Sequence, residues 1–402
     1  MFRADFNARG PYLCRKFEAM VAPYIELRHQ LHRYPELSGN ERMTARRVLS
    51  FLRPLKPDRI VTRVGGHGIL AVFDSGTEGP TVLFRADMDA LPLNETTPLD
   101  YASENRGVSH KCGHDGHTAI LTGLAAYVAC HRPSGGRLLL LFQPAEETGK
   151  GASAALRKIK CCGYLPDYAF ALHNLPGYPR NSVIVRHGTF AAASKGMIIK
   201  LKGKPAHASE PEKGKSPAAV MARLMVDLPA LSGNGKKLGY QDFVLLTLVH
   251  GNLGMPVFTS TPDEAVLMAT LRAYLNEDME ILTNRAVELV KQQASASGLG
   301  HHIHFTEEFP ATINHPDAVD VVCNAAQQLD LQVIEAGLPF RWSEDFAHFV
   351  PESRVALFGI GAGEEHLSLH HPDYDFPDDI IPVALELWKE IYRGVMGVGG
   401  RK

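Results

Sequence analysis

The chain has 402 residues, more than one ordinary hydrophobic core organises, so two domains are expected. Its composition, with 45% hydrophobic and 21% charged residues, excludes a disordered or fibrous protein and is typical of a soluble globular one. The formal net charge is −2, so there is no overall positive field that would attract nucleic acid or an anionic membrane.

The N-terminal segment and the cysteines indicate the cellular compartment. Charged residues interrupt the apolar ones throughout residues 1–30, which argues against a secretory signal. No window approaches the roughly 20 uninterrupted apolar residues of a membrane span. The six cysteines contain no CxxC pair and do not resemble a disulfide framework. We therefore expect a soluble, cytoplasmic protein without a membrane partner.

Helices and strands alternate in the first half of the chain. Residues 20–53 have apolar positions at helical spacing, interrupted where Pro35 and Gly39 end one helix. The following predicted elements are strands at 68–73, 81–92, 136–147 and 167–176, and a helix at 117–131. Strands that alternate with helices predict an α/β sheet, in which ligands gather at the carboxyl ends of the strands.

The pattern changes between residues 194 and 305. The predicted elements are a strand at 195–204, a helix at 216–232, strands at 242–252 and 264–275, a helix at 276–298 and a strand at 301–309. This β-α-β-β-α-β order is that of a ferredoxin-like module. We predict an inserted domain at 194–305 and a catalytic domain formed by 1–193 and 306–402.

Five metal-ligating side chains stand at the ends of these elements. Cys112 and His114 lie two residues apart in HKCGHDGH, and Glu147, His173 and His370 come from separate elements. Because an unpaired buried charge costs several kcal/mol, groups delivered by buried strands need a partner, and a metal ion satisfies several at once. These donors suit Zn²⁺, Mn²⁺ or Co²⁺, and their number favours two ions over one closed site.

The doublet Glu146-Glu147 predicts a hydrolytic role for the site. One carboxylate can bind metal while its neighbour takes a proton from water and passes it to a leaving amine. Glu146 is the candidate for this general base. Asp89 and Asp115 are the right residue type to orient the histidine ligands.

Other interpretations of HKCGHDGH remain open at this point. Cys112 could be a nucleophile paired with a histidine, but this leaves Glu147, His173 and His370 unexplained and predicts activity that survives chelation. The stretch could also be a polar turn that caps the following helix. His117 could support the site or bind metal.

Seven motifs, in this order, carry a resemblance to a known family: RADMDALP, HKCGHDGHTA, QPAEETGKGA, ALHNLP, GKPAHAS, SEDFAHF and LHHPDYDF. The chain resembles the amidohydrolase branch of the two-metal aminoacylase and carboxypeptidase superfamily, which includes hippurate hydrolases, auxin-conjugate hydrolases and N-acyl-amino acid amidohydrolases. The resemblance covers nearly the whole chain. It implies an α/β catalytic domain with a mixed central sheet flanked by helices, and an inserted ferredoxin-like α+β domain that acts as a lid and mediates dimerisation.

The resemblance also implies roles for individual residues. The implied ligands of two divalent metal ions are Cys112, His114, Glu147, His173 and His370, with Glu146 as the general base. His207 in the inserted domain is implied to reach the active site of the partner subunit and to polarise the scissile carbonyl. Arg272 matches a family position and could hold a substrate carboxylate by a bidentate pair.

The sequence departs from the family pattern at two places that concern substrate choice. Thr259 stands near a position where relatives often have asparagine, and Trp342 stands where they usually have glycine. A bulky indole near the site would reshape the acyl pocket. His371 beside His370 leaves a choice of ligand, in which the LHxP register favours His370.

We therefore predict a metal-dependent amidohydrolase that cleaves the amide bond of N-acyl amino acids and acts as a homodimer through the inserted domain. The alternatives are a dipeptidase or carboxypeptidase on the same scaffold, and a binding protein that has kept the metals without catalysis. A panel of hippurate, N-acetyl-amino acids and dipeptides distinguishes the first alternative, and the dispensability of Glu146 distinguishes the second.

Overall fold

The structure is a computed structural model that describes residues 21–234 and 239–397. Most of the N-terminal segment discussed above, including Cys14, lies outside the described residues. The cysteines that are described, Cys112, Cys130, Cys161, Cys162 and Cys323, are all free thiols, as expected of a chain without a disulfide framework. Among the described helices, none is both long enough and apolar enough to cross a membrane.

The chain divides into two compact units. Unit 1 comprises Met1–Phe190, Ile313–Leu338 and Asp345–Lys402, and unit 2 comprises Ala191–Thr312 and Pro339–Glu344. Residues 339–344, which we predicted to lie in the catalytic domain, belong to unit 2, as do residues 191–193 and 306–312. Main-chain hydrogen bonds attach residues 339–344 to unit 2, since Ala192 N–H donates to the carbonyls of Phe340 and Trp342 at 2.9 and 3.0 Å.

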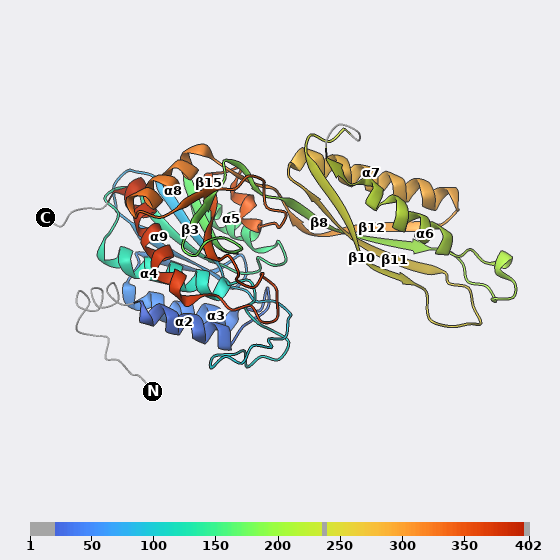
Figure 1. Ribbon diagram of the computed structural model, residues 1–402, viewed down its shortest axis with the longest axis horizontal. Helices are drawn as coiled ribbons and strands as arrows, with labels where there is room; N and C mark the ends of the chain where they lie inside the picture. The colour runs from blue at the N-terminus through green and yellow to red at the C-terminus, as the bar shows by residue number, and fades with distance from the viewer. Residues whose placement is uncertain (1–20, 235–238, 398–402) are drawn as a thin grey trace. The chain divides into compact units, whose positions relative to one another are not determined.

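An eight-stranded mixed sheet lies at the centre of unit 1 (Figure 1), with the strand order β1-β2-β4-β3-β5-β15-β6-β14. Its strands are β1 (Arg59–Val64), β2 (Gly68–Asp74), β3 (Thr81–Asp87), β4 (Arg137–Gln143), β5 (Tyr168–Pro176), β6 (Val183–Val185), β14 (Val333–Glu335) and β15 (Arg354–Gly363). β3 pairs in parallel with β4 and β5, and β5 with β15, while β2 runs antiparallel to β4. The parallel strands end at one edge, where β3 delivers Asp87 and β4 leads to the Glu146-Glu147 doublet.

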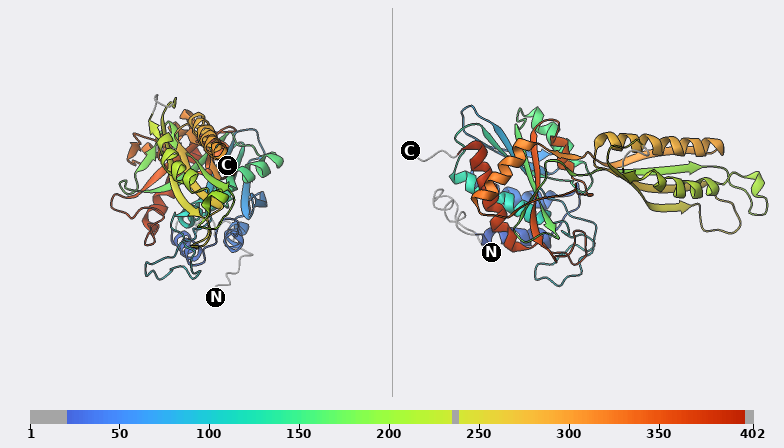
Figure 2. Two further views of the ribbon diagram at one scale, coloured as in Figure 1. Left: turned by 90° about the vertical axis from the view of Figure 1, so that its right-hand side faces the viewer. Right: turned by 45° about the horizontal axis from the view of Figure 1, so that its top comes forward.

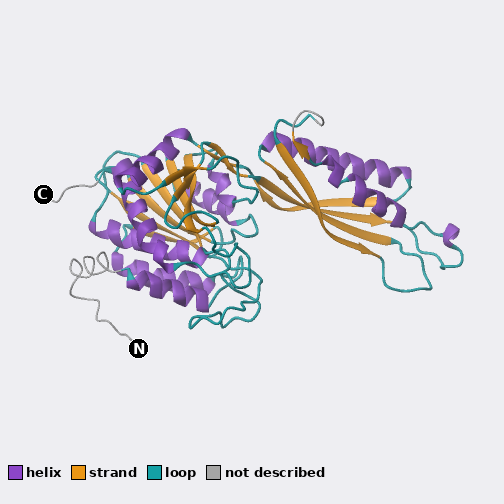
Figure 3. Ribbon diagram, in the orientation of Figure 1, coloured by secondary structure: helices purple, strands orange, loops and turns teal. Residues whose placement is uncertain are grey.

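Helices pack around this sheet, as Figure 3 shows. They are α2 (Ala22–Arg33), α3 (Arg42–Leu52), α4 (His114–Cys130), α5 (Gly151–Cys161), α8 (Pro316–Gln328) and α9 (Ile381–Met396), with the short 3-10 helices η1 (Arg53–Leu55), η5 (Asp345–Phe349) and η6 (Asp378–Ile380). α4 contacts α2, α9 and the sheet, and it is buried along almost its whole length. Phe84, Phe170 and Trp388 are fully buried in the core between these layers. The mixed α/β sheet predicted for this part is confirmed.

Unit 2 contains a five-stranded antiparallel sheet with the order β12-β8-β11-β10-β9. The strands are β8 (Ala193–Lys202), β9 (Gly233–Asn234), β10 (Phe243–Leu253), β11 (Glu264–Ala273) and β12 (Gly300–Phe309). The helices α6 (Ala218–Asp227) and α7 (Asn276–Ala296) cover one face of this sheet (Figure 2), and η2 (Pro211–Lys213) and η3 (Pro229–Leu231) are short 3-10 helices. The chain order β8-α6-β10-β11-α7-β12 is the predicted ferredoxin-like order. Two further strands, β7 (Gly188–Ala191) and β13 (Thr312–Asn314), form a separate small sheet.

One difference from the predicted elements matters for the site. The helix predicted at 117–131 begins three residues earlier, at His114, because Gly113 adopts a left-handed conformation with φ of 97° and turns the chain into the helix. Cys112 and His114 therefore stand at the beginning of α4, where backbone N–H groups are not yet used by the helix.

Candidate metal centre

The five predicted ligands meet at one place in unit 1. Cys112 Sγ lies 3.5 Å from His173 Nε2. Glu147 Oε1 lies 3.8 Å from His114 Nε2 and 3.7 Å from His370 Nε2. The ligand atoms of Cys112, His114 and His173 lie within 4.8 Å of one another, as do those of Cys112, Glu147 and His370. Cys112 belongs to both groups, and Glu147 also approaches His114, so the five side chains form one continuous cluster of candidate ligands.

The distances and the lack of hydrogen bonds fit metal ligands. Two atoms that bind one ion at about 2.0–2.3 Å are separated by roughly 3.3–3.8 Å in tetrahedral geometry. A nitrogen and an oxygen at 3.7 Å are too far apart to bond directly. Within the described part of the chain, His114 Nε2 and Glu147 Oε1 are buried and have no hydrogen-bond partner. Buried polar atoms without partners are rare, and a divalent cation between them would satisfy both.

The two buried histidines present the correct nitrogen to such an ion. His114 Nδ1 lies 3.0 Å from the carbonyl oxygen of Asp89, and His173 Nδ1 lies 2.9 Å from that of Asn174. A carbonyl only accepts hydrogen bonds, so each Nδ1 carries the proton and each Nε2 keeps its lone pair. This is the usual arrangement around a metal-ligating histidine.

The electrostatics of the cluster also favour a cation. Burial, together with the charge of Glu147, raises the pKa of the Cys112 thiol well above its ordinary value. Burial and the charge of Asp89 raise the pKa of Glu147 to about 7, against the opposing effect of His114. Burial alone would lower the pKa of His114, but Asp87 and Cys112 outweigh it and raise this pKa well above the ordinary value. Burial thus favours the protonated forms of Cys112 and Glu147, and a bound cation would favour their ionised forms instead.

The Glu146-Glu147 doublet sits in a strained turn after β4. Ala145 has a φ of 54°, in the left-handed region that residues with a Cβ rarely adopt. Glu147 N–H donates to Asp89 Oδ2 at 3.0 Å, and Asp345 N–H donates to Glu146 Oε1 at 3.3 Å. Glu146 is only 4% exposed, and its carboxylate lies within 4.8 Å of the ligand atoms of His114 and Glu147. The turn places both carboxylates beside the ring of His114, in the cluster of candidate ligands.

The two aspartates predicted to orient histidine ligands are placed differently. Asp89 contacts His114, since Oδ1 lies 3.3 Å from His114 Nδ1. Asp115 instead accepts hydrogen bonds from Arg28 Nε at 2.9 Å and His32 Nδ1 at 2.8 Å, both on α2. Successive side chains in a helix point about 100° apart, so Asp115 faces α2 while His114 faces the cluster.

The sequence left the role of His117 open and gave no role to Asp87, and both residues adjoin the cluster. Asp87 Oδ2 lies 3.7 Å from His114 Nε2, and Asp87 Oδ1 lies 2.7 Å from His117 Nδ1. His117 Nε2 lies 2.6 Å from Asn174 Oδ1, and Arg85 Nη1 donates to Asp87 Oδ2 at 2.7 Å. His117 therefore supports the cluster from the helix while Asp87 offers a sixth possible ligand atom. The available signal was the position of Asp87 at the end of an apolar buried strand.

The residues predicted in unit 2 lie on different elements of that unit. His207 is exposed, and its Nδ1 lies 2.7 Å from Ser209 Oγ. Arg272, on β11, is half-buried and donates from Nη1 to the carbonyl of Arg341 at 2.7 Å. Trp342 stacks on Phe340 with ring centroids 5.0 Å apart.

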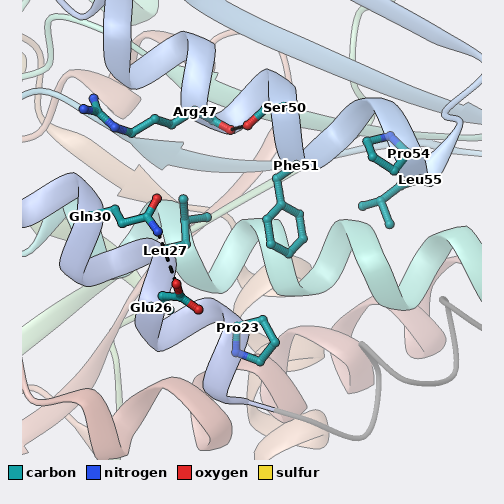
Figure 4. A pocket seen from close by; sticks show the side chains of 9 residues that line it. All are labelled: Pro23, Glu26, Leu27, Gln30, Arg47, Ser50, Phe51, Pro54 and Leu55. Carbon is teal, nitrogen blue, oxygen red and sulfur yellow. Dashed lines mark hydrogen bonds between the residues drawn. The ribbon is translucent and has the colours of Figure 1, made fainter. Parts of the chain in front are cut away.

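A separate pocket in unit 1 lies between α2, α3 and η1 (Figure 4). It has a volume of about 290 Å³, and Leu27, Phe51 and Leu55 form part of its wall. None of its lining residues belongs to the metal cluster, and it contains no histidine or cysteine.

The chain matches a known family over most of its length. The sequence model of peptidase family M20/M25/M40 matches residues 83–393, well over half of the chain. The chain belongs to this family. A hippurate hydrolase from Campylobacter jejuni is 31% identical over 92% of this chain and 95% of its own length. An N-acetyl-L-cysteine deacetylase from Bacillus subtilis is 31% identical over 89% of this chain and 84% of its own length.

A solved structure of an M20 protein agrees with the fold. The crystal structure of Bacillus subtilis YxeP, described as a dinuclear metal-binding peptidase of the M20 family, gives a TM-score of 0.77 at 25% identity. The similarity covers 95% of this chain and 99% of that one. The family, the α/β fold and the amidohydrolase class predicted from the sequence are confirmed, and this M20 chain is an amidohydrolase.

Proposed function

We propose that this M20 enzyme hydrolyses the amide bond of N-acyl amino acids, releasing the acyl group as a carboxylate and the amino acid with a free amine. The observation that carries the proposal is the buried carboxylate of Glu146 beside five converging ligand side chains. The relatives named hippurate hydrolase and N-acetyl-L-cysteine deacetylase support this substrate class.

Two divalent ions, of Mn²⁺, Zn²⁺ or Co²⁺, would be held by the side chains of Cys112, His114, Glu147, His173 and His370. Ions bound there would polarise the amide carbonyl and lower the pKa of water in the site. Burial and the charge of His117 keep the pKa of His173 well below its ordinary value, so this ring remains neutral and able to bind a cation. Asp89 keeps the Nδ1 proton of His114 in place.

Glu146 is the general base and then the general acid. Its carboxylate takes a proton as water attacks the amide carbon, and it returns this proton to the nitrogen when the C–N bond breaks. The N–H of Asp345 donates to Oε1 of Glu146 at 3.3 Å and restricts the orientation of the carboxylate. A glutamate held by the neighbouring turn needs no large motion between these two roles.

His207 donates a hydrogen bond to the oxygen of the amide carbonyl as negative charge develops there. Ser209 N–H donates to His207 Nδ1 at 3.2 Å, so a neutral ring carries its proton on Nε2 and can donate it. His207 acts in the active site of the partner subunit, and Arg272 holds the carboxylate of the substrate.

The partner is a second copy of the chain bound through unit 2. Several exposed apolar residues of unit 2 support this interface: Met225, Val226, Val249, Met255, Val257 and Phe258. Phe258 is as exposed as in an extended chain. Exposed apolar side chains on these elements would gain stability from burial against a second copy.

The experiment that tests the function is a substrate panel after metal removal. The chelated protein is given Mn²⁺, Zn²⁺ or Co²⁺ and assayed with hippurate, N-acetyl-amino acids and dipeptides. We expect metal-dependent hydrolysis of the N-acyl amino acids. Activity confined to peptides with free amino termini would assign a dipeptidase instead, and activity that resists chelation would contradict the metal-dependent reaction.

A further inference from the structure

The turn before the catalytic glutamates requires an external restraint. Ala145 has a φ of 54°, and a residue with a Cβ in this region costs about 1–2 kcal/mol relative to ordinary backbone. Its neighbours Glu146 and Glu147 depend on this turn for their direction. Strain of this kind persists only where the surrounding structure holds it.

A buried carboxylate from another part of the chain holds the turn. Ala145 N–H donates to Glu41 Oε1 at 2.8 Å, and the same oxygen accepts the N–H of Gly39 at 2.7 Å. The carbonyl of Ala145 accepts the N–H of Gly151 at 3.1 Å, so both sides of the strained peptide are bonded. Glu41 is fully buried and precedes α3, more than 100 residues away in sequence.

We propose that Glu41 is a positioning residue for catalysis, which holds Ala145 so that Glu146 faces the reacting amide and Glu147 faces the metal. This inference rests on the proposed function. Asp89 holds the other side of the same turn through the N–H of Glu147, at 3.0 Å. Glu41 thus restrains Ala145, immediately before the Glu146-Glu147 doublet, and Asp89 restrains Glu147, its second residue.

The burial of Glu41 lowers the stability of the fold, which is not expected of a residue with only a structural role. Within the described residues its second oxygen, Oε2, is buried and has no hydrogen-bond partner. Burial, with the nearby charge of Asp89, raises the pKa of Glu41 to about 7, although the N–H groups it accepts favour the ionised form. A buried acid with an unsatisfied oxygen destabilises a fold, and such groups are found preferentially at functional sites.

The test compares two substitutions of Glu41 with a matched control in unit 2. Glu41→Ala removes both accepted hydrogen bonds, whereas Glu41→Gln keeps an oxygen acceptor of the same reach. Asp278→Ala is the control, because Asp278 is also fully buried and accepts the N–H groups of Gln241 and Asp242 at 2.8–3.1 Å. The measurements are kcat and KM for an N-acyl amino acid, calorimetric titration of the metal-free protein with Mn²⁺, and Tm.

We expect Glu41→Ala to lower kcat and to weaken Mn²⁺ binding by about 10–100-fold each, the usual effect of removing a group that orients a metal ligand. We expect KM to change little. Glu41→Gln recovers most of the wild-type kcat and most of the Mn²⁺ affinity. Asp278→Ala lowers Tm but keeps the kcat and Mn²⁺ affinity of the wild type. If Glu41→Ala does not fold, Glu41→Asp, which is one methylene too short to reach both donors, gives the same readouts with smaller losses.

A folded Glu41→Ala or Glu41→Asp protein with wild-type kcat and Mn²⁺ affinity, and only a lower Tm, would overturn the inference. Failure of Glu41→Gln to recover either property would also contradict it. If the wild type hydrolyses no member of the panel, the proposed function fails, while the Mn²⁺ affinities of the Glu41 variants still decide whether this residue positions the turn.

Discussion

The two units place the histidines that we propose to take part in the reaction in opposite environments. In unit 1, His114 is fully buried and His173 is 4% exposed, and a backbone carbonyl fixes the Nδ1 proton of each ring. In unit 2, His207 is exposed and bonds to Ser209, two residues away. Both buried rings are fixed by contacts inside unit 1: His114 by Asp89, 25 residues away, and His173 by its neighbour Asn174. The segment of His207 also pairs with residues 259–261 of unit 2, and the ring itself stays exposed.

The ion pairs of the two units also differ in burial. Asp115 in unit 1 is fully buried and bonded to Arg28 and His32. Lys202 in unit 2 is 58% exposed and bonded to the partly exposed Asp263 and Glu264. Water competes with the partners of Lys202 but is excluded from those of Asp115. The loss of one partner therefore lowers the free energy of unfolding much more in unit 1.

The largest effect is expected at the catalytic glutamate. Glu146→Gln keeps the shape of the side chain but cannot accept a proton, so kcat falls by about 10²–10⁴-fold. Metal content stays at the wild-type value, because the five ligands are intact. Steady-state kinetics and elemental analysis of the same preparation measure both quantities. Equal turnover in the two proteins would reject the assigned base.

A similarly large effect is expected for the buried ion pair. Asp115→Ala leaves Arg28 without its closest buried partner and lowers the free energy of unfolding by about 3–5 kcal/mol. Lys202→Ala is the matched control, and its loss is much smaller because water screens this exposed ion pair. Urea denaturation of metal-free proteins measures both. Similar losses in the two variants would remove the distinction between the units.

A somewhat smaller effect is expected for the histidine of unit 2. His207→Ala lowers kcat by about 10²–10³-fold through the loss of one donor to the developing oxyanion, with metal content unchanged. Mixing this variant with Glu146→Gln tests where it acts. Random exchange between dimers restores about a quarter of wild-type activity if His207 serves the partner's site, since half of the dimers then have one complete site. No recovery after proven subunit exchange would place His207 in its own site.

The smallest effect concerns stability in acid. Burial alone would raise the pKa of Glu95, but hydrogen bonds from His32 and Lys111 lower it to about 2 from an ordinary value of 4.5. The unfolded chain therefore binds more protons, and the stability that Glu95 contributes above pH 4.5 is lost as pH falls from 4.5 towards about 2. Glu95→Gln flattens the dependence of Tm on pH in this window. The exposed Glu104→Gln controls for the loss of one charge, and parallel curves for wild type and Glu95→Gln would contradict the prediction.

The parts of the site that could be predicted from the sequence are those with a local signal. Cys112 and His114 are two residues apart before a helix, and Glu146-Glu147 follows an apolar strand directly. Asp87, at the end of an apolar strand, had a similar local signal, whereas the positions of Glu41 and Asp115 could not be predicted in this way. Glu41 contacts a turn more than 100 residues away, and the direction of Asp115 depends on how α4 packs against α2.

The sequence by itself determined the α/β pattern, the ferredoxin-like order of unit 2 and the chemical nature of the donors, because apolar periodicity and residue type are local properties of a chain. Only the tertiary structure decided which donors share a cluster, which nitrogen each buried ring presents, and that Glu41 holds the strained Ala145. Those features depend on distances between segments far apart in sequence, and such distances exist only once the sheet and its helices have packed.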